Sequence, residues 1–185
     1  AYFDLNDVYP SSWMKYVVEF ISKLKEEEKK GVTDVHIGGE HTIILDSNAD
    51  FYSFGSGDSG QLGHNNRHGL TQPTRMETMA LTIHASETSF SANSYLVSSH
   101  SKLQAIQVAI ICCGRAHTLV LGGSGRMYSW GNNRRGQLGH SHFENCALPR
   151  MVGQDLIESA FDKTAAKNAI ISRNVKYIAC GAYHS

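Results

Sequence analysis

Residues 128 to 140 of the sequence read Tyr-Ser-Trp-Gly-Asn-Asn-Arg-Arg-Gly-Gln-Leu-Gly-His. A closely matching stretch, Tyr-Ser-Phe-Gly-Ser-Gly-Asp-Ser-Gly-Gln-Leu-Gly-His, occupies residues 52 to 64, which lie 76 positions earlier. The same offset aligns residues 38–73 with residues 114–149 without a gap, and it superimposes a Gly-x-x-His-Thr motif in each copy. A shared register of this length indicates an internal repeat, and the repeat decides how the rest of the chain is interpreted.

Each copy combines short aromatic runs with glycines at fixed positions. The runs at 51–54 and 127–130 are typical of half-buried strands, and further strands are predicted near 34–38 and 42–46. The glycines indicate positive φ or close backbone approach, and the leucine between two glycines is expected to fill the core from a loop. We assign the following residues to the structural frame of the repeat: Gly38, His41, Tyr52, Gly55, Gly60, Leu62 and Gly63; then Gly114, His117, Tyr128, Trp130, Gly131, Gly136, Leu138 and Gly139; and Gly181 and His184 in a third copy that begins at Cys180.

The combination of Gly-x-x-His-Thr, Tyr-Ser-Trp-Gly and Gly-Gln-Leu-Gly-His resembles the repeat of the regulator of chromosome condensation family. The resemblance implies a β-propeller, which in that family has seven blades. The predicted fold class is therefore all-β: a partial, open β-propeller with blades of this type, preceded by an N-terminal amphipathic α-helix.

The repeat divides the chain into four expected segments. They are a lead-in and helix (1–31), a first repeat with a long inserted loop (32–107), a second repeat with a short helix (108–174), and the start of a third repeat (175–185). The chain begins with Ala and stops midway through a blade, and blades rely on neighbours to cover their apolar faces. We therefore expect the remaining blades of the same propeller to belong to a longer protein or assembly.

The helix is predicted from a cap at Ser11 or Ser12 to Lys30. Apolar residues recur along it at helical spacing and form one stripe: Trp13, Tyr16, Val17, Phe20, Ile21 and Leu24. The simplest interpretation is that this stripe docks on the propeller or on a neighbouring domain, and a partner-binding helix is the alternative. A membrane-surface helix is disfavoured because the polar face is mixed in sign rather than basic.

Composition excludes several classes of partner. The 185 residues carry a formal net charge of zero, so nothing global indicates nucleic acid or an anionic membrane. No apolar run is long enough to span a bilayer. The four cysteines form no Cys-x-x-Cys pair, which argues against a zinc ribbon. Cys113 matches Ile37 of the first copy, which favours buried, reduced structural thiols and a cytoplasmic or nuclear location.

No catalytic, cofactor-binding or metal-binding residue is predicted. The sequence contains no serine nucleophile elbow, no P-loop and no Gly-x-Gly-x-x-Gly between a strand and a helix. His41, His117 and His184 share one repeat position and should be held a blade width apart, whereas zinc needs ligands at about 2.0–2.3 Å. We expect these histidines to make hydrogen bonds to the backbone of strands or loops.

Surface charge differs between the two copies although their frame is shared. Residues 32–75 carry two positive and five negative side chains, and residues 108–150 carry five positive and one negative. Adjacent blades that attract each other, or that merely vary, are one interpretation. The other is a basic sector around Arg134, Arg135 and Arg150 that binds an acidic protein or phosphate partner.

Function is predicted at the level of binding. The first hypothesis is a non-catalytic protein-interaction or scaffolding module inside a larger protein or assembly. The family resemblance also implies an alternative, which is guanine nucleotide exchange on a Ran-like small GTPase. A third activity, chromatin binding, lacks a basic tail in this chain.

Overall fold

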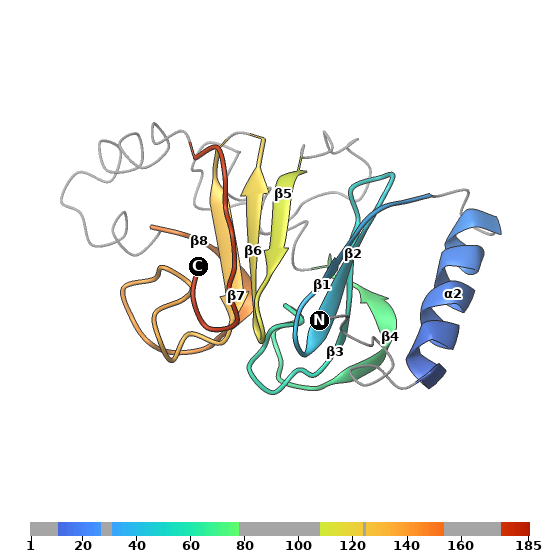
Figure 1. Ribbon diagram of the computed structural model, residues 1–185, viewed down its shortest axis with the longest axis horizontal. Helices are drawn as coiled ribbons and strands as arrows, with labels where there is room; N and C mark the ends of the chain where they lie inside the picture. Colours follow the sequence, from blue (N-terminus) through green and yellow to red (C-terminus); the bar gives the residue numbers. More distant parts are fainter. Residues whose placement is uncertain (1–10, 27–30, 78–107, 124, 154–174) are drawn as a thin grey trace, which may run out of the picture.

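The computed structural model describes residues 11–26, 31–77, 108–123, 125–153 and 175–185, with the backbone alone for 11–16. These residues form one α-helix and two four-stranded antiparallel sheets that stand next to each other (Figure 1). The elements are α2 (Ser11–Glu26), then β1 (Val32–Ile37), β2 (His41–Asp46), β3 (Phe51–Gly55) and β4 (Leu70–Arg75) in the first sheet, and β5 (Val108–Cys113), β6 (His117–Gly122), β7 (Met127–Gly131) and β8 (Cys146–Met151) in the second. The strands of each sheet lie in sequence order.

The two sheets are built in the same register. His41 pairs with Gly55 in the first sheet, and His117 pairs with Gly131 in the second. The neighbouring pair, Thr42 with Phe54, recurs as Thr118 with Trp130. The predicted all-β fold of repeated blades is thus confirmed, with the 76-residue offset preserved in the strand pairing.

Each sheet contains a fourth strand that the sequence pattern did not predict. Strands β4 and β8 pair with β3 and β7 and form one edge of each sheet. Their sequences, Leu-Thr-Gln-Pro-Thr-Arg and Cys-Ala-Leu-Pro-Arg-Met, each place a proline in the strand. Proline removes a backbone donor and is tolerated in a sheet only at such an edge, which is why a proline-bearing segment was not recognised as a strand.

The serine in the middle of each aromatic strand anchors the glycine-rich loop that follows it. The Ser53 hydroxyl donates to the carbonyl oxygen of Leu62 at 2.8 Å, and Ser129 donates to Leu138 at 2.7 Å. The same hydroxyls lie within hydrogen-bond distance of the ring Nε2 atoms of His64 (2.9 Å) and His140 (3.2 Å). Both leucines are buried in the core. Strand and loop motifs therefore occur together because they are joined by side-chain hydrogen bonds.

Glycine is required at the repeat positions for two different reasons. Gly60 and Gly136 have φ angles of 81° and 76°, which place them in the left-handed region that favours glycine. Gly38 lies instead against the ring of His41, and a Cβ atom there would come within 2.8 Å of the ring Cε1 atom. Gly114 is crowded in the same way by the ring of His117. The Gly-x-x-His motif therefore combines these two residues because the histidine ring packs directly on the backbone of the glycine.

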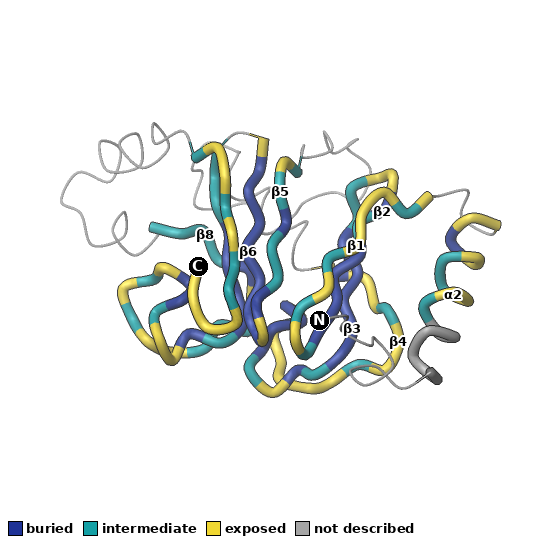
Figure 2. The backbone as a smooth tube through the Cα atoms, viewed as in Figure 1, coloured by how far each residue is buried: buried dark blue, intermediate teal, exposed yellow. Residues whose placement is uncertain are grey.

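The two sheets bury a shared apolar core between them. The first sheet and the segment after β4 contribute Ile43, Phe51 and Met76, and the second sheet contributes Ile111, Val120, Tyr128 and Trp130. The indole N–H of Trp130 donates to the carbonyl oxygen of Gln61 at 2.9 Å, so a side chain of the second repeat is bonded to a loop of the first. Figure 2 shows this buried zone along the central strands, with exposed residues in the loops, on the edge strands β1 and β4 and on α2.

Buried histidines connect successive repeats. His41 Nε2 lies 2.6 Å from the Thr118 hydroxyl oxygen, and His117 Nε2 lies 2.9 Å from the Ser185 hydroxyl oxygen. Thr118 and Ser185 follow His117 and His184 directly, so the same contact links repeat one to two and repeat two to three. We expected these histidines to make hydrogen bonds to the backbone. Each has a backbone hydrogen bond, His41 with Arg115 and His117 with His184, in addition to its contact with a hydroxyl of the next repeat.

Several predictions fall partly or wholly outside the described residues. The helix is described as far as Glu26. Residues 27–30, which were predicted to complete it, lie outside the described residues, as do most of the inserted loop (78–107) and the short helix expected in the second repeat (within 154–174). Residues 175–180, at the start of the third repeat, have no regular secondary structure.

The helix α2 packs on the face of the first sheet that points away from the second sheet (Figure 1). Leu24 is buried there, with Val17 and Phe20 packed around it. The expected docking of the apolar stripe on the blades is therefore confirmed for these residues. No helix in the described part of the chain combines the length and the apolarity needed to cross a bilayer.

Burial of His41 makes stability depend on pH. Desolvation and then the neighbouring His117 lower the pKa of His41 from 6.5 to about 4. In the unfolded chain His41 therefore becomes protonated near pH 6.5, whereas in the folded chain it becomes protonated only near pH 4. The free energy of unfolding should be constant with respect to this group above pH 6.5 and should fall by about 3 kcal/mol between pH 6.5 and 4.

Urea unfolding at pH 7, 6 and 5 measures this loss, with His41→Gln as the comparison. The variant should be less stable at pH 7 but should show a shallower fall with decreasing pH. Some slope should remain, because burial also lowers the pKa values of His64 and His117. An unchanged slope in His41→Gln would assign the pH dependence to other groups.

Candidate functional site

The Gly-x-x-His segments of all three repeats meet at one shallow hollow. Residues 37–40, 113–115 and 180–183 line a space of about 430 Å³. These segments join β1 to β2 and β5 to β6, and the third is the equivalent segment near the C-terminal end of the sequence. Because glycine and histidine fix the backbone in each segment, the two residues between them are free to differ.

Those two intervening residues supply the polar side chains of the hollow. They are Gly39-Glu40, Arg115-Ala116 and Ala182-Tyr183 in the three repeats. Arg115 Nε donates to Glu40 Oε1 at 2.8 Å, and its Nη1 donates to the Tyr183 hydroxyl oxygen at 2.6 Å. One guanidinium therefore bridges the first and third repeats.

A second arginine reaches the same tyrosine from the glycine-rich loop. The Arg135 guanidinium carbon lies 4.9 Å from the centroid of the Tyr183 ring, and that of Arg115 lies 5.7 Å away. Both distances are within the range of cation–π attraction. Tyr183 keeps 44% of its surface exposed. The result is a ring with two guanidinium groups on a surface open to solvent.

The frame of the repeat positions Arg134 and Arg135. The backbone N–H of Arg135 donates to Gln137 Oε1 at 2.9 Å, and that of Arg134 donates to Asn132 Oδ1 at 3.1 Å. In the first repeat, Gln61 Oε1 accepts in the same way from Ser59. The loops thus share this glutamine hydrogen bond, and the residues at the two positions before the glycine change from Asp58 and Ser59 to two arginines.

The electrostatic balance at this site is positive. Arg134 and Arg135 are both exposed. The hydrogen bond with Glu40, followed by that with Tyr183, raises the pKa of Arg115 above its usual value, so this group remains charged. The guanidinium groups of Arg115 and Arg135 accompany one carboxylate, that of Glu40, which favours an anionic ligand.

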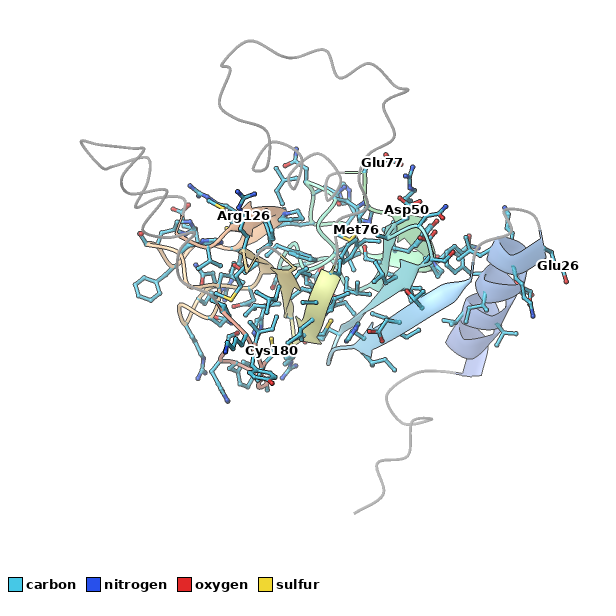
Figure 3. The ribbon with its side chains drawn as sticks, turned by 90° about the horizontal axis from the view of Figure 1, so that it is seen from above. Glu26, Asp50, Met76, Glu77, Arg126 and Cys180 are labelled. Atoms are coloured by element: carbon cyan, nitrogen blue, oxygen red, sulfur yellow. The ribbon has the colours of Figure 1, made fainter. Side chains whose placement is uncertain are left out.

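The structure places the predicted basic residues on two elements. Arg134 and Arg135 lie on the loop between β7 and β8, whereas Arg150 lies on β8 with its Nη1 at 3.5 Å from His142 Nε2. The extent of the predicted basic sector stays a prediction. Arg126, which replaces Asp50 in the second repeat, and Cys180, which lines the hollow, appear on opposite sides of the molecule in Figure 3.

Sequence reasoning missed Arg115 and Tyr183 as members of the site. Both occupy positions that change between repeats: Gly39 becomes Arg115, and Glu40 becomes Ala116 and then Tyr183. The signal was present, because variable positions inside a fixed motif are the ones that the frame does not need. Only the folded structure shows that three segments, 67 and 76 residues apart, meet in space.

The environment of Cys113 and Cys180, beside the hollow, does not favour the nucleophilic thiolate form. Burial raises the pKa of Cys113 to about 12 and that of Cys180 to about 11, so both stay protonated near neutral pH. None of the four cysteines forms a disulfide. Within the described ranges, no three His, Cys, Asp or Glu side chains are grouped so that they would hold a metal ion.

The family model for the regulator of chromosome condensation (RCC1) repeat matches residues 50–87 and 124–185, which is more than half of the chain. A second model of the same repeat matches residues 108–137. The chain belongs to the RCC1 repeat family. The RCC1 frame is thus the set of residues that ties strands to loops and blades to each other.

Individual relatives share this repeat across proteins of different kinds. The E3 ubiquitin-protein ligase HERC2 of Homo sapiens is 30% identical over 118 residues, which cover 64% of this chain and 2% of HERC2. The ultraviolet-B receptor UVR8 of Arabidopsis thaliana is 29% identical over 155 residues, which cover 83% of this chain and 26% of UVR8.

The crystal structure of human WBSCR16 resembles this structure with a TM-score of 0.52 at 21% identity. The match covers 81% of this chain and 29% of WBSCR16, and at this identity it shows the fold alone. The chain therefore spans less than a third of the length of each of these three proteins.

If the arginines of the hollow serve recognition, their removal should not damage the fold. Arg115→Gln and Arg135→Gln should keep the thermal stability of the unmodified chain, because solvent screens exposed charge pairs. Trp130→Phe removes a buried N–H···O bond and should lower the free energy of unfolding by about 1–3 kcal/mol. Thermal and urea unfolding compare the three variants. An arginine variant as unstable as Trp130→Phe would show that these side chains belong to the frame.

Proposed function

We propose that this chain is a non-catalytic protein-interaction module and that the hollow at Arg115, Arg135 and Tyr183 binds an acidic segment of a partner protein. The observation that carries the proposal is the joining of these side chains from separate repeats by hydrogen bonds and ring contacts. Each occupies a position that the RCC1 frame leaves variable.

The chemistry of the site suits a carboxylate-rich protein segment. A guanidinium group offers a planar pair of donors that matches a carboxylate, and arginine and tyrosine are enriched among the residues that contribute most to protein interfaces. Glu40 engages Arg115 Nε and disfavours an acidic group at that point. The site therefore has a negative end at Glu40 and a positive end at the arginines, and this charge asymmetry orients a bound segment.

The relatives support binding rather than one shared reaction. A ubiquitin ligase and a light receptor both contain matching repeats, so the repeat supplies a scaffold on which different activities occur. The four cysteines form no disulfide, which favours a reducing compartment, and we place the protein in the cytoplasm or the nucleus. We also expect the remaining blades of the propeller to be partners of this segment.

Guanine nucleotide exchange on a Ran-like GTPase is the second activity that the family suggests. A nucleotide-release assay with purified Ran and the full-length protein separates the two functions. Binding of an acidic segment without faster release supports an interaction module. Stimulated release would assign exchange to the protein and would replace the proposal made here.

Charge reversal at the hollow tests the binding proposal. The variant Arg115→Glu/Arg135→Glu should bind a synthetic glutamate-rich peptide at least about tenfold more weakly than the unmodified protein, because like charges replace attraction. Arg67→Glu makes the same kind of change at an exposed loop residue of the first repeat and should have little effect. Fluorescence titration at two salt concentrations measures both. Equal binding by all three proteins would contradict the proposed site.

A further inference from the structure

The equivalent faces of the first and second sheets are buried by different elements. Val120, Tyr128 and Trp130 of the second sheet pack against the first sheet. The matching residues of the first sheet, at the 76-residue offset, are Ile44, Tyr52 and Phe54. These three pack instead around Leu24 of α2. A helix thus occupies in the first repeat the place that a blade occupies in the second.

The contact between α2 and the first sheet is close. The rings of Phe20 and Tyr52 meet edge to face with centroids 4.9 Å apart. Leu24 is 2% exposed, and Val17 lies against the same cluster. On the other side of the helix, Val18 is 57% exposed. The helix therefore has one face committed to the sheet.

The aromatic residues at the equivalent positions 54 and 130 suit the elements that bury them. Trp130 donates its indole N–H to a loop carbonyl of the preceding repeat. Phe54 stands at the equivalent position and carries no donor, so it needs no acceptor above it. A helix satisfies its own backbone carbonyls internally and offers none along its side. Phenylalanine is therefore the aromatic residue that suits a helical cover.

The helix is a narrower cover than a blade. Val35 on β1 is 40% exposed, whereas its equivalent Ile111 on β5 is 4% exposed because the first sheet lies over it. Ile37, at the end of β1, is likewise 55% exposed. The helix covers the part of the face formed by β2, β3 and β4 and leaves these two β1 side chains uncovered.

We propose that α2 caps the array of RCC1 blades at the first sheet, in the place that a preceding blade would hold. The helix and a blade bury the same three side chains and therefore exclude each other. A ring of blades cannot close across this face while α2 is docked. Such a cap protects the apolar face of a terminal repeat, as terminal units do in repeat proteins.

Hydrogen exchange in the full-length protein tests the cap. Leu24→Asp places a charge in the helix–sheet contact and should speed amide exchange of β2 and β3 by at least about tenfold. Exchange of β6 and β7, which the first sheet covers, should change much less. Val18→Asp introduces the same charge on the exposed side of the helix and should change neither. Unchanged exchange of β2 and β3 in Leu24→Asp would overturn the proposal, because another element would then cover that face.

A matched pair of substitutions tests the same point without disturbing α2. Ile111→Ala should lower the melting temperature of the full-length protein by roughly 5–15 °C, because a blade covers this side chain. Val35→Ala at the equivalent position should shift it by much less, because α2 leaves Val35 exposed. Comparable losses in both variants would show that a blade covers the first sheet in the full-length protein and would overturn the cap.

Discussion

Both faces of each four-stranded sheet in this protein are apolar, and the need to cover both of them is the constraint on which the structure depends. A sheet of this size is not stable alone, since its hydrophobic faces must be removed from water. The second sheet covers one face of the first, and α2 covers the other. Blade order, the position of the helix and the contacts between successive repeats all follow from this requirement.

The RCC1 motif residues meet a second requirement, which is that buried polar groups find partners. A serine on the third strand of each sheet bonds to the leucine carbonyl and histidine ring of the following loop, and a histidine on the second strand bonds to a hydroxyl of the next repeat. Unpaired, these groups would cost folding free energy, and paired they join each strand to its loop and each blade to its neighbour. The motif therefore specifies a frame.

The frame is fixed by few positions, and several residues between them differ from repeat to repeat. Repeat one places Glu40 and Asp58 where later repeats place Tyr183 and Arg134. Changes of this kind alter the charge and shape of the surface while strand pairing stays the same. A repeat protein can in this way present a different recognition surface at each blade, and one RCC1 scaffold can serve a ligase, a receptor or the protein described here.

The sequence by itself determined the repeat, the β character of each blade and the amphipathic helix, because periodic patterns and glycine positions act over a few residues. It did not reveal strands β4 and β8, where proline conceals an edge strand. Tertiary structure alone decided that Arg115, Arg135 and Tyr183 meet and that α2 takes the place of a blade. Both arrangements depend on which surfaces pack together when the apolar faces are buried. The residues that decide this packing are far apart in the sequence, so no local pattern reveals it.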